Sequence, residues 1–146
     1  MLNIFSGALI GGLPMSDIDI MCNHKNEGMY EAVAFIENTK VCRCVIAVKD
    51  KDWQITSWYT EKEFSHRGYG KQVLVALIQY LTECLGTPVT IEYVWNGQNQ
   101  YVMDWLVENF NPVCKLPLAV RKYSDADDWE AHIYKLDKQK VLDFCA

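Results

Sequence analysis

The sequence has no uninterrupted apolar run of the roughly 20 residues that a helix needs to cross a bilayer. It also lacks the basic start and unbroken apolar core of a secretory signal, since Gly11, Gly12 and Pro14 interrupt the early hydrophobic stretch. Internal repeats and low-complexity tracts are absent from the sequence as well. We therefore expect a cytoplasmic protein that does not enter a membrane.

An excess of basic residues is also lacking. The chain has 14 Lys and Arg against 19 Asp and Glu, which gives a formal net charge of −5. A globally acidic surface disfavours non-specific binding to nucleic acids and anionic membranes, and Lys115, Arg121 and Lys122 form only a small basic cluster. We expect partners that carry an amine or a positive charge, and we do not expect a nucleic acid.

Cysteine is frequent, but its spacing is not that of a disulfide framework or a zinc site. The pairs Cys22-x-His24 and Cys42-x-Cys44 both lack the spacing of two to four residues that is common in zinc sites. Cys42 and Cys44 alternate in phase with Ile46 on an apolar strand face. We predict reduced, buried thiols and no metal site.

The length and composition favour one folded domain. The chain has 146 residues, of which 50% are hydrophobic and 12% aromatic, enough for a single core. No linker-like shift in composition divides the chain, so we predict one domain over residues 1–146. Residues 1–28 read as a short irregular region, within which residues 2–5 and 17–23 have some strand character.

From Tyr30 onward the hydrophobic pattern predicts a regular series of elements. Alternating residues predict a β-hairpin over residues 30–38 and 40–48, followed by a strand over residues 53–60. Apolar residues at helical spacing predict a helix over residues 70–85, which Gly86 and Pro88 end. A strand over residues 88–95, a helix over about 99–110, and strands over 113–122 and 129–137 follow.

This order, β-β-β-α-β-α-β-β, predicts an α/β (α+β) fold with a mixed sheet and helices packed on it. An antiparallel meander leads into a β-α-β unit, whose two strands are parallel. The final strand, if exposed, could pair across a homodimer.

The segment between the third strand and the first helix carries Gly68 and Gly70. Glycine lets the backbone take positive φ and lets a ligand approach closely, and the first amides of a helix have no partners within the helix. With Arg67 and Lys71 beside them, these amides favour a diphosphate. A plain tight turn is the alternative. The Walker and dinucleotide patterns do not fit, because residues 65 and 73 are not glycine.

The loop sequence FSHRGYG at residues 64–70 resembles the acyl-CoA loop of the GNAT N-acetyltransferase superfamily, Gln/Arg-x-x-Gly-x-Gly/Ala. The predicted element order also matches the GNAT order, and WLVENF at residues 105–110 is similar to the end of the second helix of that family. The resemblance covers about residues 30–137. It implies a mixed, mostly antiparallel sheet flanked by helices, with a splayed central pair of strands that holds the thioester.

The resemblance further implies acetyl-CoA (coenzyme A) as the cofactor. Its diphosphate would lie on the loop amides, and its pantetheine arm would run along the edge of the third strand. The implied cofactor-binding residues are Trp58, Tyr59, Thr60, Ser65, His66, Arg67, Gly68, Tyr69, Gly70, Lys71, Asn96 and Asn99.

The sequence departs from the family pattern in three places. Ser65 replaces the usual Gln or Arg, and the region before residue 28 is short, so the acceptor pocket is either open or completed by a partner. Trp105 occupies the usual position of a general-acid tyrosine, and an indole N–H does not titrate usefully. Tyr101, one helical turn earlier on the same face, could take that role. Glu92 is the candidate base, and Glu61 is a second one.

We therefore predict an acetyl-CoA-dependent N-acetyltransferase, a GNAT-type acyltransferase that acts on a primary amine of a protein or small molecule. The alternative is a catalytically inactive GNAT-fold binding or interaction module, which Trp105 and the short N-terminal region favour and the intact glycine loop opposes. Asp125, Asp127 and Asp128 form an acidic turn that could attract a cationic acceptor.

Overall fold

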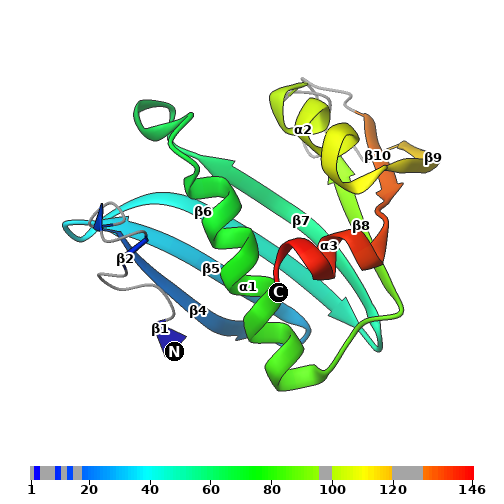
Figure 1. Cartoon of the computed structure of the whole chain (residues 1–146). Helices are drawn as coiled ribbons and strands as arrows, with labels where there is room; N and C mark the ends of the chain where they lie inside the picture. Colours follow the sequence, from blue (N-terminus) through cyan, green and yellow to red (C-terminus); the bar gives the residue numbers. More distant parts are fainter. Residues whose placement is uncertain (1, 4–8, 11–12, 15–17, 96–99, 120–129) are drawn as a thin grey trace, which may run out of the picture.

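The computed structural model describes residues 2–3, 9–10, 13–14, 18–95, 100–119 and 130–146. Eight strands form one sheet in the order β1-β4-β5-β6-β7-β8-β10-β9 (Figure 1). These strands are β1 (Leu2–Asn3), β4 (Asp19–Asn26), β5 (Met29–Ile36), β6 (Thr39–Lys49), β7 (Asp52–Thr60), β8 (Thr90–Trp95), β9 (Val113–Ala119) and β10 (Glu130–Lys135). A separate pair consists of β2 (Leu9–Ile10) and β3 (Leu13–Pro14), and the helices are η1 (Lys62–Phe64), α1 (Tyr69–Leu85), α2 (Gln100–Phe110) and α3 (Lys138–Phe144).

Strands β4 to β7 form the predicted antiparallel meander. The turn between β5 and β6 contains Glu37 and Asn38, both with positive φ. The turn between β4 and β5 requires Gly28, because its φ is +72° and a Cβ there would lie 2.8 Å from the carbonyl oxygen of Val48. These tight connections keep the register in which alternate side chains of β5 and β6 face the core.

Only the first halves of β7 and β8 pair with each other. The parallel register runs from Asp52 opposite Thr90 to Ile55 opposite Tyr93, although β7 continues to Thr60. Just after this point the register of β6 with β7 shifts, which leaves Thr56 as an extra residue in β7. The two strands therefore diverge, and the predicted splayed central pair is confirmed.

Helix α1 crosses one face of the sheet, with α3 beside it (Figure 1). Its apolar stripe, including Val73, Leu77 and Leu81, is fully buried. Gln79 of α1 donates a hydrogen bond from Nε2 to the carbonyl oxygen of Cys145, at 2.9 Å, which attaches the end of α3 to α1. None of the helices among the described residues is long and apolar enough to cross a membrane.

The structure corrects three of the expectations from sequence. Residues 19–26 form strand β4, so the first 28 residues are not uniformly irregular. The last strand, β10, lies between β8 and β9, so it has no free edge for pairing across a dimer. Helix α3 was not expected, because its seven residues come directly after a strand pattern. The side chain of Asp137 caps this helix by accepting a hydrogen bond from the amide of Lys140.

Cys42 and Cys44 lie on the buried strand face where the alternating pattern places them. Cys22, Cys42, Cys44 and Cys145 are buried in the core, and burial raises the pKa of the Cys22 and Cys145 thiols to about 12 and that of Cys42 to about 11. Cys84 and Cys114 are exposed.

Candidate functional site

The loop between β7 and α1 has a conformation that leaves the first amides of α1 without hydrogen-bond partners in the helix. His66 and Gly68 both have positive φ, +64° and +83°. Ser65 donates a hydrogen bond from Oγ to the carbonyl oxygen of Lys62, at 2.8 Å. The amide of Gln72 makes the first helical bond, to the carbonyl oxygen of Gly68. The amides of residues 69–71 therefore have no acceptor within the helix and can bind an anion.

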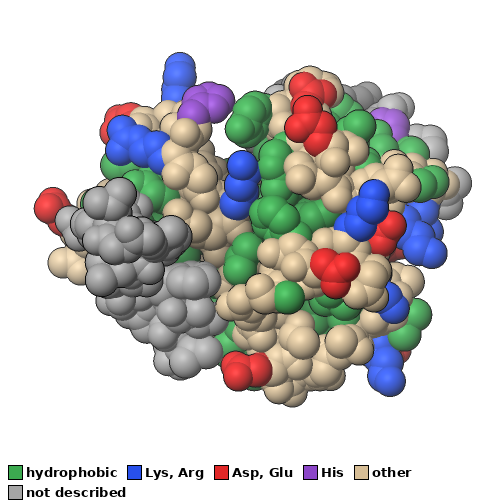
Figure 2. Space-filling view, viewed as in Figure 1, with side chains coloured by type: hydrophobic (Ala, Val, Ile, Leu, Met, Phe, Trp, Pro, Cys, Tyr) green, Lys and Arg blue, Asp and Glu red, His purple; other side chains and the backbone are tan. Residues whose placement is uncertain are grey.

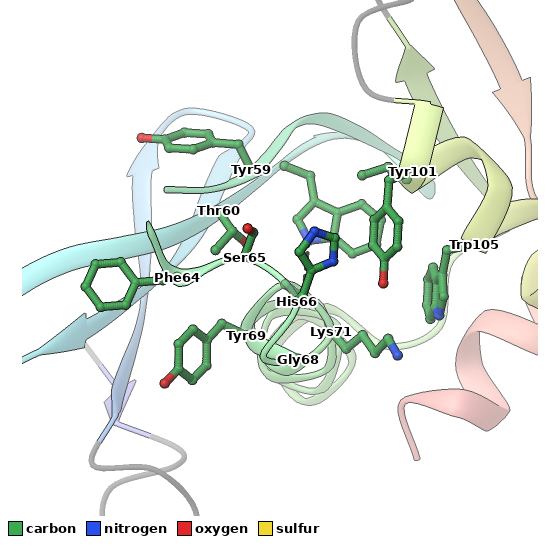
Figure 3. Close-up of a pocket in the computed structure, with 13 residues that line it drawn as sticks. Tyr59, Thr60, Phe64, Ser65, His66, Gly68, Tyr69, Lys71, Tyr101 and Trp105 are labelled. Atoms are coloured by element: carbon green, nitrogen blue, oxygen red, sulfur yellow. Dashed lines mark hydrogen bonds between the residues drawn. The ribbon is translucent and has the colours of Figure 1, made fainter. Parts of the chain in front are cut away.

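A cavity of about 260 Å³ lies beside these amides, between the end of β7, the loop and α2 (Figure 3). On the face shown in Figure 2, hydrophobic side chains gather where Figure 1 places α2 and α3. The residues that line the cavity are Trp58, Tyr59, Thr60, Phe64, Ser65, His66, Gly68, Tyr69, Gly70, Lys71, Tyr101, Val102 and Trp105.

The cavity has a positive electrostatic character although the protein is acidic overall. Lys71 and His66 contribute nitrogen atoms to its lining, and none of the lining residues is Asp or Glu. The Nζ atom of Lys71 lies 5.6 Å from the ring centre of Trp105, a cation–π contact. An anionic ligand would therefore meet the Lys71 ammonium and free amides here without repulsion from a carboxylate of a lining residue.

Trp58 forms the inner wall of the cavity. Its Nε1 atom donates a hydrogen bond of 2.9 Å to the carbonyl oxygen of Gly70. Its ring packs edge-on against Tyr93 of β8, at 6.3 Å between centroids, and against Trp105 of α2, at 5.8 Å. One side chain thus connects β7, α1, β8 and α2 at the place where β7 and β8 diverge.

At Gly70 neither the backbone conformation nor a Cβ is a problem, but a larger side chain would have no room. Its φ is not positive, but a Cβ there would lie 3.5 Å from both Thr60 Oγ1 and Trp58 Nε1. Thr60 is itself held by Cys42, with 3.1 Å between Oγ1 and Sγ. A side chain larger than methyl at Gly70 would point into the cavity wall.

Helix α2 brings Tyr101 and Trp105 to the opposite side of the cavity. Tyr101 is 57% exposed, and its ring stands edge-on to His66 at 5.1 Å between centroids (Figure 3). Trp105 lies deeper and packs edge-on against Phe110 and Phe144, at 5.1 and 5.4 Å. Phe144 belongs to α3, so the helix that the sequence pattern did not reveal supports this wall.

Most of the cofactor-binding residues expected from sequence meet at this cavity. Arg67 is the exception among those described: it does not line the cavity, although its guanidinium lies 5.5 Å from the ring centre of Phe64, which does. Asn96 and Asn99 lie outside the described residues, as do Asp125, Asp127 and Asp128. Phe64 and Val102 were not anticipated; Phe64 is part of the glycine-loop motif, and Val102 follows Tyr101 on a helix.

Glu92 lies away from the cavity. Its neighbours Ile91 and Tyr93 are buried in the core, so the alternation of β8 places Glu92 on the opposite face of the sheet. Its Oε2 atom is 2.6 Å from Lys115 Nζ, and Gln54 Nε2 donates to Oε1 at 3.2 Å. The hydrogen bond and charge of Glu92 raise the pKa of Lys115. The structure thus decides the face of Glu92, which the sequence left open.

No protein-family model matches the sequence, and no curated protein does. Solved structures do match its fold. NAA60 from Arabidopsis thaliana, in complex with a bisubstrate analogue, aligns at a TM-score of 0.56 and 10% identity, over 75% of this chain and 76% of its own. The ribosomal-protein-S18-alanine N-acetyltransferase from Escherichia coli aligns at 0.56 and 15% identity, over 77% of this chain and 70% of its own.

A third similar structure is RimL, a ribosomal L7/L12 α-N-protein acetyltransferase in complex with coenzyme A. It aligns at a TM-score of 0.57 and 15% identity, over 77% of this chain and 64% of its own. At sequence identities this low, the similarity shows a shared fold alone. The protein has the fold of the GNAT N-acetyltransferases, a mixed α/β sheet flanked by helices with a splayed central strand pair.

Proposed function

We propose that the protein is an acetyl-CoA-dependent N-acetyltransferase that acylates a primary amine. The observation that carries this proposal is the cavity at the start of α1. It combines free amides at residues 69–71 with Lys71, has no carboxylate in its lining, and opens where β7 and β8 diverge. RimL, which has a similar fold, was solved in complex with coenzyme A.

The residues present fit the two ends of an acyl-CoA. The amides of residues 69–71 and the dipole of α1 suit the diphosphate, and Gly70 leaves room for it beside Trp58 and Thr60. The aromatic walls suit the less polar pantetheine arm. Beyond Ile55 the backbone of β7 pairs with β6 but not with β8, so polar groups on the edge that faces β8 could bind the arm and polarise the thioester carbonyl.

Acetyl transfer to an amine requires mainly that the two reactants be held together. Such positioning can lower a barrier by about 7 kcal/mol or more. In this proposal the cavity holds the thioester, and a deprotonated amine attacks its carbonyl carbon. Tyr101 stays the proposed proton donor to the departing sulfur, because it lines the cavity. A Tyr101→Phe variant should then lose about 100-fold in kcat while binding acetyl-CoA normally.

A protein N-terminus is the acceptor to test first. Two of the similar structures are described by their action on ribosomal proteins, an α-amine of L7/L12 and an alanine of S18. A lysine side chain or a small polyamine are the other amine acceptors that this proposal allows. Cytoplasmic location stays a prediction from the sequence.

The proposal is tested by calorimetric titration of the protein with acetyl-CoA. Gly70→Trp should abolish binding, since its side chain would occupy the cavity wall. Thr87→Trp is the matched control, because it adds the same side chain at an exposed position past the other end of α1, roughly 25 Å away along the helix. Binding to the parent and to Thr87→Trp alone supports the cofactor site. A folded parent that does not bind acetyl-CoA refutes it.

A catalytically inactive binding module is the second candidate. Trp105 favours it, because an indole packed among Trp58, Phe110 and Phe144 offers no acid to the reaction. The protein would then bind acetyl-CoA but leave peptides with free N-termini, polylysine and polyamines unacetylated. Turnover with any of these acceptors rejects the binding-module alternative.

A further inference from the structure

Lys71 is a cation whose charge is available inside the cavity. It lies in the first turn of α1, and its side chain extends toward Trp105 (Figure 3). The ion pairs among the described residues involve Lys25, Arg43 and Lys115, and Lys71 takes part in none of them. Among the described residues, no Asp or Glu lines the cavity. Its charge is therefore not neutralised by the described residues and can act on a bound anion.

The two cations of the loop point in different directions. The guanidinium of Arg67 lies over Phe64, 5.5 Å from the ring centre, whereas Lys71 lies over Trp105. Phe64 and Trp105 stand on opposite sides of the loop (Figure 3). Trp105 in turn contacts Trp58, which belongs to the part of β7 beyond its last pair with β8. Lys71 is therefore the loop cation on the side of the strand divergence.

An acyl-CoA carries two kinds of negative charge that Lys71 could meet. One is the diphosphate, and the other is the thiolate that develops when the C–S bond breaks. The loop amides already provide for the first. Trp105 cannot protonate the second, the thiolate, because an indole is not a useful acid.

We propose that the ammonium group of Lys71 stabilises the leaving thiolate in this protein, an inference that rests on the proposed function. The amine lone pair forms the C–N bond, the C–S bond breaks, and its electron pair goes to sulfur. The proton lost by the amine goes to water. Lys71 holds the sulfur anion by its charge and keeps its own protons, and Tyr101 then donates a proton to the sulfur. Lys71 thus acts as a catalytic residue without being a general acid.

Lys71 is exposed, but its Nζ atom lies 5.6 Å from the ring centre of Trp105, and Trp58 lines the same cavity. Charges interact more strongly beside apolar groups than in bulk water. An opposite charge within about 4–6 Å lowers the pKa of an acid by about 1–3 units. His66, Tyr59, Tyr69 and Tyr101 are the other titratable groups that line the cavity.

The first test measures the pKa of the coenzyme A thiol in the complex, from the ultraviolet absorbance of the thiolate. In the parent this pKa should lie about one unit below that of free coenzyme A. Lys71→Met should return it to the free value, and Lys71→Arg should keep it low. Lys62→Met, which removes an exposed lysine of η1 outside the cavity lining, is the matched control and should leave it low. Because Lys71 is exposed, these variants should fold.

The second test separates the thiolate from the diphosphate by using acetyl-pantetheine, which has no phosphate at all. Lys71→Met should lower kcat about tenfold with acetyl-CoA and by the same factor with acetyl-pantetheine. A loss confined to acetyl-CoA would show that Lys71 binds only phosphate, and would overturn the inference.

The outcomes distinguish this inference from the proposed function. A parent that binds coenzyme A, but whose bound thiol has the same pKa in the Lys71→Met variant, overturns the inference and leaves the cofactor site standing. A parent that does not bind coenzyme A overturns both.

Discussion

The indole nitrogen of Trp58 donates a hydrogen bond of 2.9 Å to the carbonyl oxygen of Gly70. The bond joins the end of β7 that has diverged from β8 to the first turn of α1, beside the cavity. It sets the distance between the two sides of the cavity, since Trp58 also packs against Trp105 on α2. The shape of the site thus depends on a side chain outside the glycine motif.

Trp58→Phe should lower the free energy of unfolding by about 1 kcal/mol, because it removes this hydrogen bond and keeps an aromatic ring. It should also weaken acetyl-CoA binding, since the loop loses an attachment. Urea denaturation and calorimetry measure the two effects. Tyr59→Phe, next along the strand and 40% exposed, is the stability control and should change stability by less than about 0.5 kcal/mol. Equal stability of parent and Trp58→Phe would count against a structural role for the bond.

Gly68 and Gly70 should respond differently to alanine. Gly68 has a φ of +83°, and a Cβ at this position would meet no atom within 4 Å, so Gly68→Ala should cost about 1 kcal/mol through backbone conformation alone. Gly68→Asn should cost less, because Asn tolerates positive φ better. Gly70→Ala should be neutral or slightly stabilising, since its backbone is helical and its contacts are ordinary. Thermal denaturation ranks the three variants; a stability loss in Gly70→Ala as large as in Gly68→Ala would contradict this assignment.

Arg43 compensates the buried carboxylate of Glu31, with 2.8 Å between Nε and Oε2. The side chain of Glu31 is only 11% exposed, so Arg43→Met should destabilise the protein by about 2 kcal/mol. Lys25 lies 3.9 Å from the same oxygen but is 45% exposed, and Lys25→Met should cost less than about 0.5 kcal/mol. Chemical denaturation compares the two. Similar losses in both variants would mean that the contact of Arg43 is not the main support of Glu31.

Stability should fall at alkaline pH. Burial raises the pKa of the thiols of Cys22 and Cys145 to about 12 and that of Cys42 to about 11, above the ordinary 9.0. The folded state therefore keeps protons that the unfolded state releases above pH 9. The free energy of unfolding should be unaffected by these groups below pH 9 and should fall above it, by up to about 1.4 kcal/mol per pH unit for each thiol.

Urea denaturation between pH 8 and 11 under reducing conditions measures this slope, which a flat profile would contradict. Alkylation at pH 8 is the control for thiol burial. Cys84 and Cys114 should react first, and the buried thiols should react only in denaturant.

Glu92 stays the proposed general base, but because it lies on the sheet face opposite the cavity it can take the amine proton only through water. Glu92→Gln should then lower kcat about 100-fold. Lys115→Met removes the ion-pair partner, at 2.6 Å, and keeps the carboxylate, so activity should be retained. Steady-state kinetics across pH distinguish the variants. Equal activity of Glu92→Gln and parent would assign Glu92 to the sheet surface alone.

Much of the fold follows from patterns that are local in the chain. The alternation in β5 to β8 and the helical spacing in α1 predict both the elements and their buried faces. The glycine loop can be predicted from sequence because a left-handed backbone, or the close approach of a ligand to the backbone, favours glycine. Helix α3 was missed, because a helix of seven residues has little periodicity of its own and is stabilised by packing against α1 and α2.

The sequence by itself determined the order of the elements and the loop that starts α1, because each depends on residues close together in the chain. The splayed strand pair was implied by the family resemblance. Only the tertiary structure decided that Glu92 pairs with Lys115, that β10 is an inner strand, and that Arg67 and Lys71 point apart. The physical reason is that the partner of a side chain comes from distant segments. Periodicity specifies the face on which a residue lies, but not the group that meets it there.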